Sequence, residues 1–216
     1  MKRFLTSLLP ASVWRMMQKA AFVATRTYYR IVPRAKTYLE SSKVRARRQQ
    51  EGFFEKFCRG KGLDIGYGGD KLCDNCQGWD IEDGDAGTLK GLADNSFDFV
   101  YSSHCLEHLD NADEALKNWW RVVKTGGYLI LYLPERDLFE RKKTLPSRWN
   151  TSHKRFFLLD RDELPDTVGV LPFIQRTLTG YEILKADICK NEYNIRTEEQ
   201  QADGEYSIEI VIRKTH

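Results

Sequence analysis

A short strand that runs directly into a glycine-rich turn constrains this chain more than any other feature. Residues 62–65 have the composition of a short buried strand, and Gly66, Gly68 and Gly69 follow at once. Glycine lets a backbone turn sharply and come close to a ligand, because no Cβ intervenes. In open α/β sheets, ligands bind at the carboxyl ends of the strands, where this turn would lie. The segment therefore predicts a small-molecule site at one edge of a sheet.

Strands and helices alternate along the rest of the chain. We expect strands at residues 62–65, 79–81, 97–102, 128–133, 181–188 and 206–213, and helical structure at residues 36–59, 111–123 and part of 161–178. The almost wholly apolar segment 128–133 is typical of a central strand that is buried on both faces. Gly126 and Gly127 are expected to close the helix before it. This alternation predicts a mostly parallel sheet with helical crossover connections.

The composition supports a packed domain and hides an asymmetry of charge. With 216 residues, of which 41% are hydrophobic, the chain can bury a core. Residues 1–62 carry 15 Lys and Arg against 3 Asp and Glu, whereas residues 63–216 carry 19 against 28. We expect a basic, helical extension over residues 1–61 and an α/β domain over residues 62–216. A basic arm on an acidic body is expected to meet something anionic.

Between Pro10 and Pro33, apolar residues recur at steps of three and four beside a basic stripe, which predicts an amphipathic helix. Three roles stay open for it. It packs on the body or over the active site, it contacts an anionic membrane surface, or it binds nucleic acid, in that order of preference. The apolar run after Met1 is too short for a secretory signal, and no stretch reaches the roughly 20 apolar residues that span a bilayer. We expect a cytoplasmic protein, with peripheral contact at the inner face of the membrane left open.

The five cysteines form no dense framework, and their odd number favours a reducing compartment. Cys73 and Cys76 make one C-x-x-C pair. Because no second pair lies nearby, a turn or a helix start is favoured over a metal or redox role. We expect no metal ligands among the site residues.

The residues around the glycine turn narrow the class of ligand. Position 71 is Lys, so the third glycine of a dinucleotide fingerprint is missing. Asp64, directly before the turn, suits a ligand that carries an amine and a sulfonium. Asp80, at the tip of the second expected strand, is placed to accept hydrogen bonds from ribose hydroxyls. Asp85 and Ala86 follow closely and are candidates for the adenine edge.

Four stretches of the chain together resemble the class I S-adenosylmethionine-dependent methyltransferases of the type 11 group. They are GLDIGYGG, GWDIEDGDAGTL, ADNSFDFVYSSHCLEHL and WWRVVKTGGYLILYLP, which span about residues 62–134 in the order of that family. The resemblance implies a Rossmann-like class I methyltransferase sheet, mostly parallel with an antiparallel last strand, and helices on both faces. It implies S-adenosyl-L-methionine as cofactor. The cofactor-binding residues that we expect are Asp64, Gly66, Tyr67, Gly68, Asp80, Ile81, Asp85, Ala86 and Ser103.

The chain also departs from the family's pattern. Only 15 residues separate Asp64 from Asp80, and only four separate Asp80 from Asp85. The first helix must therefore be very short, and the usual helix and third strand after Asp80 are compressed or missing. Tyr67 replaces a small residue, and Asp70 stands where the family often has Gly. The chain is similar in these respects to a compact branch associated with bacterial surface polysaccharides.

Two histidines are the candidates for catalysis. His104 directly follows the expected strand 97–102 and is the first choice for a general base or for orienting the acceptor. His153 lies in a basic segment with Arg148 and Lys154, which suits an acceptor bearing a carboxylate or phosphate. His108 is expected to have a structural role. We expect O-methylation of a sugar or another anionic small molecule, in surface polysaccharide biosynthesis. A non-catalytic membrane-associated module and an RNA methyltransferase are the alternatives.

Overall fold

The computed structural model describes residues 39–216 together with Val13, Met16, Met17, Ala20 and Ala24. The amphipathic helix expected between Pro10 and Pro33 therefore lies largely outside the described residues, and its three possible roles stay predictions.

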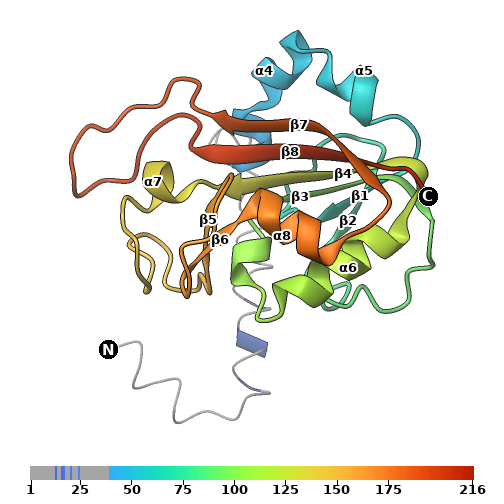
Figure 1. Cartoon of the computed structure of the whole chain (residues 1–216), viewed down its shortest axis with the longest axis horizontal. Helices are drawn as coiled ribbons and strands as arrows, with labels where there is room; N and C mark the ends of the chain where they lie inside the picture. Colours follow the sequence, from blue (N-terminus) through green and yellow to red (C-terminus); the bar gives the residue numbers. More distant parts are fainter. Residues whose placement is uncertain (1–12, 14–15, 18–19, 21–23, 25–38) are drawn as a thin grey trace.

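A six-stranded sheet forms the centre of the molecule (Figure 1). Its strands, in the order β2-β1-β3-β4-β8-β7, are β2 (Cys76–Trp79), β1 (Gly62–Ile65), β3 (Phe97–Ser103), β4 (Val123–Pro134), β8 (Ser207–Lys214) and β7 (Tyr181–Cys189). Strands β2, β1, β3 and β4 pair in parallel, and β8 runs antiparallel to both β4 and β7. The predicted fold, a mostly parallel class I sheet with an antiparallel last strand, is confirmed.

The register of the sheet brings the candidate residues to one edge. Ile65, at the end of β1, pairs with Trp79 of β2 on one side and with Ser102 of β3 on the other. Because these strands are parallel, the residues that follow them emerge at the same edge. The glycine turn, Asp80 and His104 are such residues.

Two of the expected boundaries are wrong. The second strand ends at Trp79, not at residue 81, so Asp80 is the first residue beyond it. Gly126 and Gly127 do not close a helix, since the helix already ends at Val122 and both glycines lie within β4. A Cβ on Gly127 would lie 2.5 Å from the carbonyl oxygen of Asp98. The glycine therefore serves the close pairing of β4 with β3.

One face of the sheet is covered by α6 (Ala112–Val122), α8 (Val170–Thr177) and the short 3-10 helix η2 (Leu106–His108) (Figure 1). The side chain of Asn111 caps α6 by accepting a hydrogen bond from the N–H of Glu114. Ala115, Trp119 and Val122 then recur at helical spacing and are fully buried against the sheet. The apolar stripe of α6 thus explains why this segment is helical and which face it buries.

The other face is covered by α3 (Glu40–Lys43), α4 (Arg45–Gln50) and α5 (Phe53–Phe57), all of which precede β1 in the chain. Residues 66–75, between β1 and β2, contain no helix, and residues 80–96 contain no strand. The first helix, which we expected to be very short, is therefore absent, and the third strand, which we expected to be compressed or missing, is missing. Helices that precede β1 cover the surface that the missing helix leaves open. The division at residue 61 stays a prediction.

The arginines of α4 do not form a solvated face. Arg48 is fully buried, and its guanidinium lies 2.7 Å from the carboxylate of Glu209, a residue inside β8. It also donates a hydrogen bond of 3.0 Å to the hydroxyl of Tyr101. Arg47 bonds the same Glu209 and also Glu205. These two arginines face the sheet because an acid buried in a distant strand needs their positive charge.

After β4 the chain forms α7 (Arg136–Phe139) and then a small parallel pair of strands, β5 (Phe156–Leu158) and β6 (Thr167–Gly169). The loop between α7 and β5 returns to η2, where the N–H of Lys154 donates to the carbonyl of Glu107 at 2.7 Å. This bond fixes the segment that carries His153 beside the end of β3.

The buried ion pair makes a prediction about acid stability. Arg48 and Arg47 hold the pKa of Glu209 down to about 2, below its usual value of 4.5, although burial opposes the shift. The stabilisation is complete above pH 4.5 and is lost as the pH falls toward 2. Glu209→Gln should lower the free energy of unfolding by about 3–5 kcal/mol at neutral pH and weaken its decline in acid. Urea unfolding at several pH values measures both.

Glu182→Gln is the matched control, because Glu182 pairs with Arg213 in the same pair of strands but at the surface. It should cost less than about 1 kcal/mol. Equal costs for the two variants would contradict a special role for the buried pair.

Candidate active site

The glycine turn lines a cavity of about 190 Å³ at the edge of the sheet. The residues that line it are Leu39, Glu40, Ser41, Gly66, Tyr67, Gly68, Asp70, Ser103 and His104. They come from the segment before and within α3, from the β1–β2 loop and from the end of β3. The sequence predicted the last two groups, but it gave no sign that the α3 segment would form part of the wall.

The two leading glycines of the turn have different tasks. Gly66 has a φ of +71°, and a Cβ there would lie 2.8 Å from the sulfur of Cys105, so this glycine permits close packing against the end of β3. Gly68 has a φ of +57°, and a Cβ there would meet no atom within 4 Å. The space beside Gly68 is open, which fits close approach of a ligand to the backbone.

Asp64 fits a cationic group at this turn. It is buried, its Oδ2 accepts the N–H of Leu72 at 2.7 Å, and its Oδ1 has no hydrogen-bond partner among the described residues. Burial raises the pKa of Asp64 to about 8. A buried acceptor without a donor is costly, and an ammonium group in reach would remove that cost. The chemistry of this position therefore fits the amine of a methionine-like ligand.

Asp80 is held beside the same turn. Its Oδ2 accepts the N–H of Gly68 at 2.9 Å, and its Oδ1 accepts the N–H of Ile81 at 2.8 Å. Carboxylate oxygens each accept more than one hydrogen bond, so the position stays compatible with binding ribose hydroxyls. The ring of Tyr67 packs over Gly78 of β2, where a Cβ would lie 2.5 Å from it. Gly78 thus makes room for the large residue that replaces a small one in the turn.

The residues expected at the adenine lie elsewhere. Asp85 lines a second cavity of about 310 Å³, together with His108, Leu109 and residues at the start of α6. The carbonyl of Ala86 accepts the indole N–H of Trp119, and Ile81 is 42% exposed. Typical ligand pockets hold roughly 300–1,000 Å³, so the first cavity suits the methionine part of the cofactor and not the whole of it. Of the expected contacts, Gly66, Tyr67, Gly68 and Ser103 line the first cavity, and only Asp85 lines the second.

His104 stands on the wall of the first cavity in a constrained geometry. Its φ is +48°, its Nε2 lies 2.9 Å from the hydroxyl oxygen of Ser207, and Phe139 and Tyr206 contact its ring edge. Burial lowers the pKa of His104 to about 4, so the ring is neutral near neutral pH. Glu40 comes within 3.8 Å of its Nε2. The sequence predicted that His104 lies at the edge of the sheet where ligands bind, and the structure places it there. Its role in the reaction stays a prediction.

His153 lines neither of these two cavities. It is buried, and its Nδ1 lies 2.9 Å from Glu140 Oε1. The nearby guanidinium of Arg155 is already hydrogen-bonded within the protein, because it donates to the carbonyls of Leu106 and Asp110. We did not expect Glu140, because its partner is brought to it only by the folding of the loop between α7 and β5.

The C-x-x-C pair lies in the β1–β2 loop, where Cys76 begins β2 and no helix starts. The two sulfurs are 3.4 Å apart and both thiols are free. Hydrogen bonds from Cys58 and Cys76 lower the pKa of Cys73 to about 4.

Comparison with known proteins decides the class of the site. Residues 46–131 match the family described as a methyltransferase domain, and this segment contains the glycine turn, Asp80 and His104. This match and the class I fold together support the expected enzyme class, an S-adenosylmethionine-dependent methyltransferase, and its cofactor.

One solved structure agrees with this fold, and a second is reported beside it. A S-adenosylmethionine-dependent methyltransferase from Archaeoglobus fulgidus aligns with a TM-score of 0.52 at 21% identity, over 86% of this chain and 100% of that one. A possible histamine N-methyltransferase from Thermotoga maritima aligns with a TM-score of 0.49 at 17% identity, over 88% of this chain and 98% of that one. No curated protein matches the sequence significantly. Among the described residues, no helix is both long enough and apolar enough to cross a membrane.

The open space at Gly68 yields a prediction about cofactor affinity. Gly68→Ala should weaken binding of S-adenosylmethionine by about tenfold or more, because the added methyl group enters the space beside the ligand. Its cost in protein stability should be about 1–2 kcal/mol, from the strained φ alone. Calorimetric titration and thermal unfolding measure the two effects.

Gly126→Ala is the matched control, since Gly126 also has a positive φ, +81°, and open space at its Cβ position, but lies in β4 away from the cavity. It should cost similar stability and leave cofactor affinity unchanged. Equal loss of affinity in both variants would argue against the cavity as the cofactor site.

Proposed function

We propose that this methyltransferase O-methylates a hydroxyl group of a sugar or a related anionic small molecule, in the assembly of a surface polysaccharide. The observation that carries the proposal is the position of His104, a neutral imidazole on the wall of the cavity that also contains Gly66 and Gly68. Bound S-adenosylmethionine supplies a methyl group that passes to the acceptor oxygen as its bond to sulfur breaks.

The task of His104 is to orient the acceptor. A neutral imidazole has a lone pair on one ring nitrogen, which can accept the hydrogen bond of a hydroxyl group and aim its oxygen. Ser207 fixes the ring from one side, and Tyr132 and Phe139 contact it from others. A side chain held in this way keeps donor and acceptor in line, which is the main demand of methyl transfer.

The anionic character of the acceptor is supported by the basic segment before β5. Lys154 is half exposed and pairs with Asp110, which lines the second cavity. A cation at this rim would attract a carboxylate or phosphate group of the acceptor. We include in the proposal a cytoplasmic location and a peripheral membrane contact through the basic N-terminal helix. Nucleic acid is not among the favoured partners.

Transfer of a ¹³C-labelled methyl group from S-adenosylmethionine to polysaccharide precursors tests the proposal. The expected product is a methyl ether, which is stable to mild alkali and has the carbon chemical shift of a methyl group on oxygen. A methyl ester or a methylamine as the only product would overturn the hydroxyl acceptor. Saturable cofactor binding without transfer to any extract would favour the non-catalytic alternative.

Replacement of His104 should separate turnover from binding. His104→Ala should lower kcat by about 10²–10⁴-fold, the range of a positioned acid–base group, and change cofactor affinity little. His104→Asn retains a hydrogen-bond acceptor and should recover part of the loss if orientation is the task. Steady-state kinetics and calorimetry measure the two quantities, and an unchanged kcat in His104→Ala would remove this residue from the reaction.

A further inference from the structure

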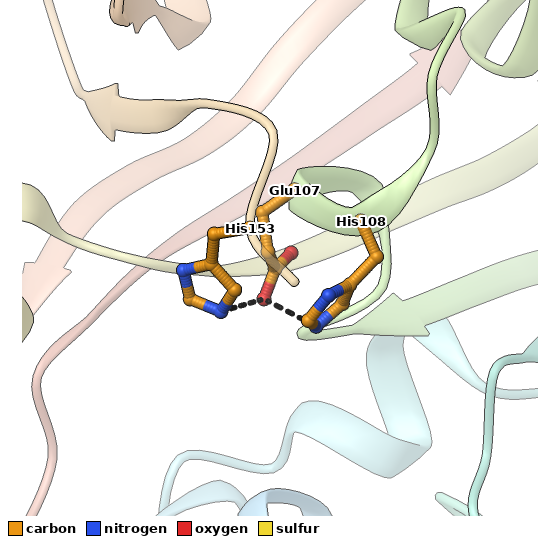
Figure 2. Close-up of side chains that lie close together, drawn as sticks. All are labelled: Glu107, His108 and His153. Atoms are coloured by element: carbon orange, nitrogen blue, oxygen red, sulfur yellow. Dashed lines mark ion pairs between the residues drawn. The ribbon is translucent and has the colours of Figure 1, made fainter. Parts of the chain in front are cut away.

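Three side chains from two separate segments converge beside the second cavity. Glu107 and His108 belong to η2, and His153 belongs to the loop before β5 (Figure 2). Oε1 of Glu107 lies 3.9 Å from Nε2 of His108 and 3.9 Å from Nε2 of His153. One ligand atom from each residue lies within 4.8 Å of the others.

Glu107 lacks the partners that a buried acid needs. It is fully buried, and neither of its carboxyl oxygens has a hydrogen-bond partner among the described residues. Arg155 is the neighbouring cation, but its guanidinium donates to the carbonyls of Leu106 and Asp110. Burial of a carboxylate costs several kcal/mol unless a cation or hydrogen-bond donors compensate. The fold thus keeps a buried acid whose carboxyl oxygens have no hydrogen-bond partner among the described residues.

The hydrogen bonds of His153 fix which ring nitrogen carries the proton. Glu140 already accepts bonds from Ser147 Oγ and from the N–H of Arg148, as a carboxylate does. His153 Nδ1, at 2.9 Å from Glu140 Oε1, is therefore the donor. In the neutral ring this leaves the lone pair on Nε2, which is the atom that faces Glu107.

The hydrogen bonds of His108 fix its proton in the same way. The hydroxyl of Ser152 donates to Asn150 Oδ1 at 2.7 Å, so it accepts from His108 Nδ1 at 2.9 Å. The lone pair of His108 is then also on Nε2. The lone pairs of two imidazole rings and an unpaired carboxylate therefore face one another, and no hydrogen-bond donor lies between them. Such an arrangement attracts a cation.

We propose that Glu107, His108 and His153 bind one divalent transition-metal ion. Such ions bind imidazole nitrogen and carboxylate oxygen at about 2.0–2.2 Å, which places neighbouring ligand atoms roughly 3.0–3.6 Å apart. The gaps of 3.9 Å need to close by less than about 1 Å on binding. His108, with 30% of its side chain exposed, has room for that movement.

The chemistry of the ligands selects among metals. Two imidazoles and one carboxylate favour Zn²⁺, Fe²⁺ or Mn²⁺ over Ca²⁺ and Mg²⁺, which prefer oxygen. The bond from His153 to Glu140 is the carboxylate–histidine contact that orients histidine ligands in metal sites. The sequence did not lead us to expect this site, because 45 residues lie between Glu107 and His153.

Three protein ligands leave coordination positions open. His108 lines the cavity of about 310 Å³ that also contains Asp85, so an exposed position of the ion faces that cavity. There the ion can bind and orient a carboxylate or phosphate oxygen of the acceptor. This role rests on the proposed function, whereas binding of the ion does not.

The test uses the full chain without a histidine tag, freed of metal by chelation and titrated with Zn²⁺ in a calorimeter and with Co²⁺ in a visible absorption spectrometer. We expect saturation at one ion per chain. Glu140→Gln should weaken binding by about 10–100-fold, and Glu107→Gln should weaken it further. His216→Ala, which removes a histidine outside the cluster, should leave the affinity unchanged. Absence of saturable binding, or unchanged affinity in Glu107→Gln, would overturn the proposal.

Metal-free thermal unfolding separates a ligand from a structural residue. Glu107→Gln without metal should unfold at the same temperature as the parent or higher, because the amide removes a buried charge and can donate to a histidine lone pair. A clearly lower unfolding temperature would assign Glu107 a structural role and contradict the site. Binding of S-adenosylmethionine to the metal-free chain is measured in parallel, so that failure of the methyltransferase proposal is distinguished from failure of the metal site.

Discussion

The buried ion pair between Arg48 and Glu209 is the interaction on which the rest of the structure depends. The two groups lie 2.7 Å apart with no exposed side-chain surface, and Arg47 and Lys185 bond the same carboxylate. In this shortened sheet no helix follows β1, so one face must be covered by helices that precede it. Because a buried acid in β8 is stable only with its cations, α4 is held at one place on that face.

The position of α4 in turn decides the shape of the active site. Helix α3 leads directly into α4, and Ser42 donates hydrogen bonds of 2.8 and 2.6 Å from its N–H and hydroxyl to Asp70 in the glycine loop. Glu40 and Ser41 thereby complete the wall of the cavity that Gly68 and His104 also line. The unusual Asp70 of the loop thus holds the segment of α3 against the glycine turn, at the candidate cofactor site.

The parts of the fold and of the candidate site that depend on neighbouring residues in the sequence were predictable. The glycine turn, the neighbouring Asp80 and the strand that delivers His104 follow from chain-local patterns, and the missing helix follows from the short spacing between Asp64 and Asp80. Contacts between distant segments were not predictable, because nothing near Arg48 in the sequence indicates an acid 161 residues away. For the same reason the sequence placed His153 in a basic segment that contacts the acceptor, whereas folding buries it between Glu140 and Glu107.

The most direct test of the account is a crystal structure of the chain with S-adenosylhomocysteine. The account predicts the amino-acid part of the ligand against Gly66 and Gly68, with its amine toward Asp64 and its ribose hydroxyls donating to Asp80. It also predicts the sulfur on the side of the cavity where His104 lies. A ligand bound elsewhere, or a cavity that stays empty at saturating ligand, would contradict the assignment of this edge of the sheet as the methyl-donor site.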